Sequence, residues 1–182
     1  MNVKGISIKN CKSWVENEKG EDKWIEVVNS LPEESREHIK DGMVFTSNWY
    51  PLQVYIDVND EICKRWGDGT HRIIFEMARE GAQENLKTTY RIFMKIASPG
   101  YIVKKAARLF TQFYDEGELK LVKNEENHFV FHLENFENFP IIFERIAGYM
   151  EGVLLVTRAK NPKATFKYDP SKRKAVFDVR FL

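Results

Sequence analysis

Residues 86–114 read LKTTYRIFMKIASPGYIVKKAARLFTQFY, and this stretch decides how the rest of the chain is interpreted. Apolar residues before the break recur close to helical spacing, which predicts a long helix over about 70–97. Ser98-Pro99-Gly100 interrupts the pattern, and proline is favoured at the first position of a new helix. A second amphipathic helix follows, with Ile102 and Phe110 on its apolar side. The stretch therefore predicts two consecutive helices joined at a sharp break.

The same spacing continues upstream of this stretch. It predicts a helix over 10–30 that is interrupted near Gly20, a short helix that stops at Gly42, and a helix over 52–66. Gly81 lies inside the predicted helix over 70–97, where glycine costs ~1 kcal/mol relative to alanine. We expect close backbone packing at Gly81 to be the reason for its presence.

The pattern changes after Gly117. Apolar residues alternate with polar ones in two segments, 119–121 and 129–133, which is typical of a hairpin. Helical spacing returns over 138–156, and a second alternating hairpin ends the chain around an Asp169-Pro170-Ser171 turn. A helical N-terminal two-thirds packed on a C-terminal antiparallel sheet, ordered strand–strand–helix–strand–strand, is an α+β fold. We expect a single domain over residues 1–182.

Composition restricts the class of protein. The chain has 182 residues, of which 43% are hydrophobic and 30% charged, as in a soluble folded domain. No apolar run approaches the ~20 residues of a membrane span. The first residues lack the apolar core of a secretory signal, and two cysteines cannot form a disulfide framework. These features predict a cytoplasmic protein.

Charge is unevenly distributed along the chain. Residues 1–62 carry 7 basic and 12 acidic side chains, a net charge of −5, whereas residues 157–182 carry 8 basic and 2 acidic ones, a net charge of +6. The basic hairpin mixes cations with Phe166 and Tyr168, as single-strand binders do. Its aromatics alternate as a buried face should, so a solvated hairpin is favoured over a nucleic-acid site.

No catalytic or metal-binding set can be assembled from the sequence. A P-loop, a GxGxxG fingerprint, an HExxH pair and a Cys-x-x-Cys are all absent. His128 and His132 are four residues apart on a predicted strand, ~13 Å along the chain, which is too far for joint ligation of one metal. Cys11 lies beside two lysines but has no histidine near it in sequence. We therefore predict a non-enzymatic protein without catalytic residues, metal ligands or a cofactor.

Three segments resemble the haem-nitric-oxide/oxygen-binding (H-NOX) superfamily. They are the motif Asn85-Leu86-Lys87-Thr88-Thr89-Tyr90-Arg91-Ile92-Phe93-Met94, the break at Ser98-Pro99-Gly100, and Ala147-Gly148-Tyr149-Met150-Glu151-Gly152 followed by two strands. The pattern is also similar to haem-free relatives, the 4-vinyl-reductase-like and TRAPP-type domains. The resemblance covers nearly the whole chain and implies an H-NOX-like fold.

The resemblance also implies where haem-binding members hold their cofactor. In them a histidine on the helix that here contains Ile102 to Phe113 ligates iron, and a Tyr-x-Ser-x-Arg motif on the next segment holds the propionates. Residues 99–114 contain no histidine, and residues 119–135 contain no such motif. Without an axial ligand and an anchor for two carboxylates, specific haem binding loses its main contacts. The chain therefore resembles a haem-free branch of the superfamily.

These observations lead to two hypotheses of function. The first is a sensory or regulatory domain that binds a small lipophilic ligand between its helices and signals to a protein partner. Its predicted pocket is lined by Trp14, Met94, Ile102, Phe110, Phe113 and Met150. The alternative is a structural or assembly module that self-associates through its apolar helical surface. A third interpretation is that the same side chains are ordinary residues of the hydrophobic core.

Overall fold

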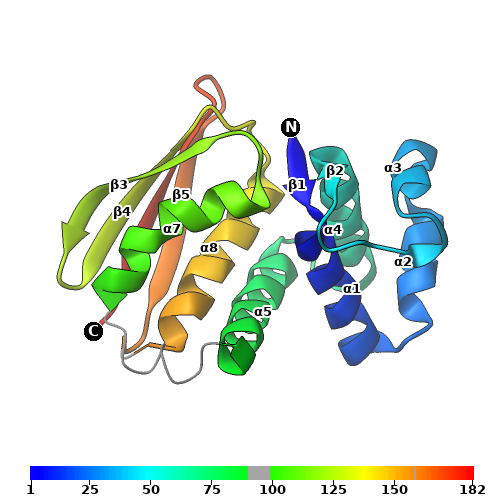
Figure 1. Cartoon of the computed structure of the whole chain (residues 1–182), viewed down its shortest axis with the longest axis horizontal. Helices are drawn as coiled ribbons and strands as arrows, with labels where there is room; N and C mark the ends of the chain where they lie inside the picture. The colour runs from blue at the N-terminus through cyan, green and yellow to red at the C-terminus, as the bar shows by residue number, and fades with distance from the viewer. Residues whose placement is uncertain (90–98, 158) are drawn as a thin grey trace. The chain divides into compact units, whose positions relative to one another are not determined.

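The computed structural model describes residues 1–89, 99–157 and 159–182, and of residues 85–89, 103, 104 and 107 it describes the backbone alone. The chain divides into two compact units (Figure 1). The N-terminal unit comprises Met1–Ile74 with Gln112–Asp115, and the C-terminal unit comprises Phe75–Thr111 with Glu116–Leu182. The expectation of a single domain over 1–182 stays a prediction.

The N-terminal unit is mainly helical. Its elements are β1 (Asn2–Lys4), α1 (Gly5–Lys19), α2 (Lys23–Ser30), α3 (Glu33–His38), the 3-10 turn η1 (Lys40–Gly42), β2 (Trp49–Pro51) and α4 (Leu52–Trp66). The interruption predicted near Gly20 is confirmed, although α1 begins at Gly5 and so earlier than predicted. Its core is formed by side chains with no exposed surface, among them Ile8, Val15, Trp24, Val27, Val58 and Ile62.

The N-terminal unit also contains a short strand pair that was not predicted from the sequence. Strand β1 pairs antiparallel with β2, with Val3 opposite Tyr50. Val3 also bridges to Tyr114, and the backbone N–H of Asn2 donates to an Asp115 carboxylate oxygen at 2.6 Å. These contacts attach residues 112–115 to the unit. Three-residue strands carry too little alternation to be recognised from sequence.

The C-terminal unit contains the sheet. It is built from most of α5 (Arg72–Thr89), most of α7 (Pro99–Phe113), β3 (Glu118–Glu125), β4 (His128–Glu134), α8 (Pro140–Leu155), β5 (Lys163–Asp169) and β6 (Lys174–Arg180). The strands form one antiparallel sheet in the order β3-β4-β6-β5. The predicted α+β class, with strand–strand–helix–strand–strand in its C-terminal part, is confirmed, and Pro99 begins α7 as predicted. No helix within the described ranges combines the length and apolar content that a membrane span requires.

One face of the sheet is packed with aromatic rings. Alternate residues of β4 and β6 are buried, including Phe129, Phe131 and Phe177, and α8 packs on β5 and β6 (Figure 1). Phe143 of α8 has no exposed surface and lies between 5.7 and 6.2 Å, centroid to centroid, from four rings: Phe136, Phe166, Tyr168 and Phe177. At these separations aromatic pairs add to the free energy of burial. This cluster is the centre of the core of the C-terminal unit.

Two glycines allow the backbone of α8 to pack directly against the backbone of α5. Gly148 and Gly152 are four residues apart and so lie on one face of α8. A Cβ built on Gly148 would overlap the carbonyl oxygen of Phe75, and one on Gly152 would overlap that of Arg79. The Gly148-Tyr149-Met150-Glu151-Gly152 motif is therefore a helix-packing motif. Close packing predicted at Gly81 is wrong for the described residues, because no described atom lies within 4 Å of a Cβ built there.

Glu151 joins three elements of the same unit. Its carboxylate lies 3.2 Å from Nε of Arg79 on α5 and accepts the backbone N–H of Ala164 on β5 at 3.1 Å. The Glu151 side chain is 13% exposed, so this ion pair is less screened by water than a surface pair. The carboxylate thus helps to fix α8 between α5 and the sheet.

Candidate functional site

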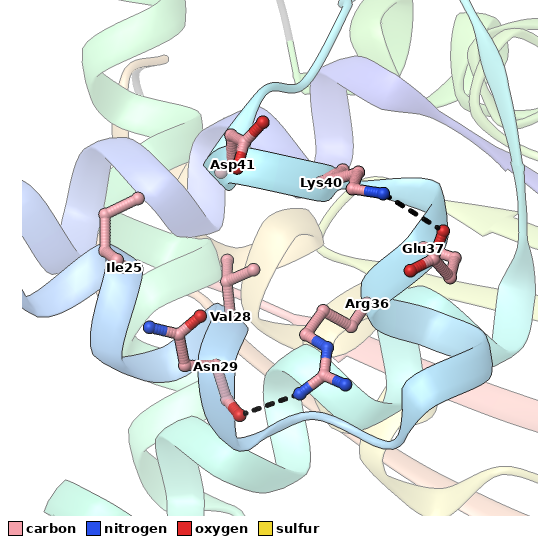
Figure 2. A pocket seen from close by; sticks show the side chains of 8 residues that line it. Ile25, Val28, Asn29, Arg36, Glu37, Lys40 and Asp41 are labelled. Carbon is pink, nitrogen blue, oxygen red and sulfur yellow. Dashed lines mark hydrogen bonds and ion pairs between the residues drawn. The ribbon is translucent and has the colours of Figure 1, made fainter.

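A pocket of about 450 Å³ opens in the N-terminal unit between the end of α2, α3 and η1 (Figure 2). It is lined by Ile25, Val28, Asn29, Arg36, Glu37, Lys40, Asp41 and Gly42. Val28 is 2% exposed, whereas Ile25 is 42% exposed. Ile25 and Val28 are its apolar lining residues, and most of the others are charged.

The chain direction changes sharply at one wall of this pocket. Asp41 has a φ of 55° and Gly42 a φ of 71°, so two consecutive residues adopt the left-handed conformation. The Gly42 carbonyl accepts hydrogen bonds from Trp24 Nε1 at 2.9 Å and from Lys12 Nζ at 3.2 Å. A Cβ on Gly42 would lie 2.9 Å from Nε1 of Trp24, whose side chain has no exposed surface. The wall therefore requires glycine at 42 and is held by a buried indole.

Four charged side chains surround the pocket, two of each sign. Lys40 Nζ lies 3.6 Å from a Glu37 carboxylate oxygen, and both side chains are more than half exposed, so this pair contributes little to stability. The half-buried Arg36 donates from Nη1 to the Asn29 carbonyl at 3.5 Å. In the described part of the chain the Asp41 carboxylate makes no hydrogen bond or ion pair. Figure 2 shows both dashed contacts at the rim.

The six predicted pocket residues are distributed over both units. Trp14 and Phe113 belong to the N-terminal unit, where the Trp14 ring packs edge-on against Trp66 at 6.5 Å. Ile102, Phe110 and Met150 belong to the C-terminal unit. Met94 lies outside the described residues.

The three residues of the C-terminal unit differ in burial. Phe110 is 6% exposed, and its ring lies 5.9 Å from that of Phe136, so it is a core residue. Ile102 and Met150 are only half-buried. The predicted lipophilic pocket therefore stays a prediction for all six residues.

The four histidines do not fit a haem held through α7. Residues 99–113 contain no histidine, cysteine or methionine. His128 and His132 lie on β4. Because side chains alternate along a strand, both histidines lie on the face opposite to that of the buried Phe129 and Phe131. Lys123 donates to Nδ1 of His128 at 3.0 Å and Nε2 lies 2.9 Å from Asp178, so both ring nitrogens have partners.

The remaining histidines lie at helix ends in the N-terminal unit. His38 is exposed at the end of α3, and His71 is half-buried just before α5. Burial raises the pKa of the Asp60 carboxyl group, and the nearby charge of His71 opposes that shift. Within residues 1–89, 99–157 and 159–182, no three histidine, cysteine or acidic side chains cluster as a metal site would require.

Neither cysteine is placed as a nucleophile. Cys11 is fully buried, and its thiol points to the Ser7 carbonyl and the Asn59 side chain. Burial raises the pKa of the half-buried Cys63 thiol to about 11, and the charges of Asp60 and Asp68 add to the shift. A thiol with a raised pKa is a poor nucleophile at neutral pH.

The pocket between α2, α3 and η1 was not predicted from sequence. Gly42 was interpreted only as the end of a helix, and no role was predicted for the charged residues around it. The Asp41-Gly42 dipeptide was the available signal, because both residue types tolerate positive φ and so mark a sharp turn. A turn alone does not indicate a cavity.

No protein-family model matches this chain, and no curated protein matches it. Solved structures do match. A crystal structure of the Fe(II) unliganded H-NOX protein from K. algicida gives a TM-score of 0.71 at 11% identity, covering 98% of this chain and 96% of that chain. An H-NOX protein from S. oneidensis in the Fe(II)NO state gives 0.72 at 11% identity, covering 98% and 99%.

A third match comes from a solution structure. The IWP-051-bound H-NOX from Shewanella woodyi in the Fe(II)CO state gives a TM-score of 0.67 at 11% identity, covering 97% of this chain and 93% of that chain. At such low identity the likeness is one of backbone arrangement. Because all three matches span nearly the full length of both chains, this chain has the H-NOX fold.

Proposed function

We propose that this chain is a non-enzymatic, haem-free sensory or regulatory domain of the H-NOX fold. It binds a small lipophilic ligand, signals to a protein partner in the cytoplasm, and is related to 4-vinyl-reductase-like and TRAPP-type domains. One observation carries the proposal. The fold matches H-NOX structures described in Fe(II) states over 98% of the chain, whereas α7 offers no histidine, cysteine or methionine.

The ligand is held by the helices. In the C-terminal unit Ile102 and Met150 are half-buried, so each still presents apolar surface that a ligand could cover. Phe110 packs in the core and supports the helix that carries Ile102. For Trp14, Met94 and Phe113 the assignment to this pocket rests on the sequence alone.

Signalling requires that the protein has two conformational states with different affinities for the ligand. A ligand shifts such an equilibrium only by its differential affinity for the two states. The partner must in turn bind one state better than the other, since the coupling between two sites is reciprocal. This role needs no catalytic group.

Native mass spectrometry of the freshly purified chain tests the proposal. We expect a population that carries an additional small mass, which is released on denaturation. Ile102→Ala and Met150→Ala each remove a half-buried apolar side chain, so the ligand-bound fraction should fall in both variants. Val122→Ala, at the irregular position of β3 where the side chain is 50% exposed, is the matched control and should retain the ligand.

A chain that carries no additional mass in several preparations, and gains none after incubation with a mixed lipid extract, contradicts the proposal. Equal ligand-bound fractions in the Ile102, Met150 and Val122 variants would instead reject the assignment of the residues. Folding of each variant is checked by thermal unfolding before ligand content is compared.

The alternative function is an assembly module that dimerises. It is favoured by three large apolar side chains exposed in the segment that joins η1 to β2 and in β2 itself: Met43 (57%), Phe45 (59%) and Trp49 (44%). Surface of this kind often marks a protein interface. Analytical ultracentrifugation of dilute protein separates the functions, because a tight dimer without ligand supports assembly and a ligand-bearing monomer supports the sensor.

A further inference from the structure

We infer that the outer edge of β5 binds an extended acidic peptide segment of a protein partner as a fifth strand of the sheet. Strand β5 stands at one end of the order β3-β4-β6-β5, so among the described strands it pairs with β6 alone (Figure 1). The edge belongs entirely to the C-terminal unit. The inference rests on the proposed function in one respect, because it names the surface and the chemistry of the partner that signalling requires.

The hydrogen-bond pattern of the sheet shows which backbone groups of β5 point outward. In an antiparallel pair, hydrogen-bonded and non-hydrogen-bonded residue pairs alternate. Just after β6, the Phe181 N–H donates to the Asn127 carbonyl in front of β4, so odd-numbered residues of β6 bond to β4 and even-numbered ones to β5. Even-numbered residues of β6 stand opposite odd-numbered residues of β5. The backbone groups of Ala164, Phe166 and Tyr168 therefore point away from the sheet.

One of these outward groups is bonded within the chain and two are not. The Ala164 N–H donates to the Glu151 carboxylate of α8 at 3.1 Å, which agrees with its outward direction. In the described part of the chain, no group accepts the N–H of Phe166 or of Tyr168. Tyr168 is 40% exposed and Phe166 is half-buried. An edge with unpaired backbone groups is a template for pairing with another chain.

The opposite edge of the sheet is less suited to strand addition. Strand β3 has a register irregularity between Leu121 and Lys123, and irregularities of this kind protect an edge from pairing. The pairing of β5 with β6 is regular over all seven residues of Lys163–Asp169. Of the two edges, β5 is therefore the one that a further strand can follow.

Unpaired lysines on β5 favour an acidic partner. Lys163 and Lys167 are exposed, and within the described ranges neither ammonium group forms an ion pair or a hydrogen bond. The cations of β6 are neutralised instead, because Lys174 Nζ and Arg180 Nε each lie within 3.4 Å of a carboxylate oxygen. The positive charge of the C-terminal hairpin is thus left without partners on its edge strand.

The two faces of β5 determine the sequence pattern of the partner. Phe166 and Tyr168 lie on the face that α8 covers, and both rings lie within 5.8 Å of the Phe143 ring, centroid to centroid. Lys163 and Lys167 lie on the other face, because side chains alternate along a strand. Residues directly opposite one another in an antiparallel pair share a face and interact. The partner segment therefore alternates acidic residues, beside the lysines, with apolar residues, beside the rings.

A second copy of this chain is a poorer occupant of the same edge. Its β5 carries the same two lysines, and like charges on neighbouring strands destabilise a pair. Natural proteins place lysine on edge strands to prevent such pairing. The same side chains thus disfavour self-association and admit an acidic strand.

The experiment titrates the full-length ¹⁵N-labelled chain with the blocked peptide acetyl-EVEVEVE-amide and follows amide chemical shifts and hydrogen exchange. We expect saturable shifts along β5, and slower exchange at the amides of Phe166 and Tyr168, which gain carbonyl acceptors. The charge-reversed peptide KVKVKVK should not bind. EEVVVEE has the same composition without alternation, and it should bind about tenfold more weakly or worse because it places acidic residues beside the rings.

Lysine variants test the same assignment from the side of the protein. Lys163→Gln and Lys167→Gln should each weaken binding of EVEVEVE about threefold, and the double variant about tenfold, because cross-strand charge pairs are lost. Lys105→Gln changes an exposed lysine of α7 in the same unit and alters the net charge equally. This control should bind the peptide as the unchanged chain does.

Four results with the peptides would overturn the inference: no saturable shift with EVEVEVE, equally tight binding of EEVVVEE, shifts at β3 in place of β5, or equal affinity in the three lysine variants. Pairing of β5 with a second copy, seen as concentration-dependent shifts of the same amides without peptide, would also overturn it. The peptide comparison needs no variant and so remains decisive if one of them fails to fold.

The inference and the proposed function can fail separately. Native mass spectrometry of the same preparation reports the lipophilic ligand independently of the peptide. A chain that carries ligand but binds no peptide overturns this inference alone. A chain that binds the peptide but never carries ligand contradicts the proposed ligand alone.

Discussion

Gly148→Ala and Gly152→Ala are each expected to lower the free energy of unfolding by about 1–3 kcal/mol or more, because overpacking a close contact costs that much. The added methyl group would overlap the carbonyl oxygen of Phe75 or of Arg79 on α5. Backbone atoms cannot rotate away as a flexible side chain can, so α5 and α8 would have to separate. Urea denaturation followed by circular dichroism measures the change.

Gly81→Ala is the matched control on the partner helix. Gly81 lies in α5 as Gly148 lies in α8, but no described atom would contact its Cβ. Alanine should therefore stabilise the chain by about 0.5–1 kcal/mol through helix propensity alone. Substitutions of one kind would thus change stability in opposite directions. Stabilisation by Gly148→Ala would contradict the close packing of α8 on α5.

Phe143→Ala should lower the free energy of unfolding by about 3–5 kcal/mol, as deletion of a buried phenylalanine side chain does. Phe143 has no exposed surface and lies within 6.2 Å, centroid to centroid, of four other rings. The cavity left by its side chain would be surrounded by aromatic rings that cannot collapse into it without moving the sheet. Thermal and urea unfolding both report the loss.

Phe45→Ala is the control for this substitution. Phe45 is 59% exposed, so the same truncation should change stability by no more than about 0.5 kcal/mol at a fixed protein concentration. Similar losses at Phe143 and Phe45 would show that the aromatic cluster is not the centre of the core. A loss of stability in the Phe143 variant alone would support the central position of the aromatic cluster.

Much of the C-terminal unit could be predicted from sequence because its elements are long and strongly patterned. Alternation of Phe129, Phe131 and Leu133 with polar residues predicted β4 and its buried face, and both were confirmed. The Gly148-to-Gly152 segment was recognised as part of a family pattern without its physical reason. That reason, backbone contact with α5, depends on a neighbour distant in sequence.

Other features could not be predicted because they depend on contacts between distant segments. Strands β1 and β2 are three residues each and exist through their pairing with one another. The pocket of the N-terminal unit depends on the Trp24 indole that holds the Gly42 carbonyl. Gly81 was predicted to pack closely, and the described neighbours leave it open. A local sequence pattern does not show which distant segment a residue will contact.

This chain has the H-NOX fold, and we propose that it does not bind haem. The sheet face against which α8 packs is filled by the rings around Phe143, and α7 offers no histidine, cysteine or methionine. The most direct test is to express the chain in haem-supplemented medium, separate it by gel filtration, and measure absorbance and haem content. We expect no Soret band to elute with the polypeptide. One haem per chain, with a Soret band that follows the protein peak, would contradict the claim.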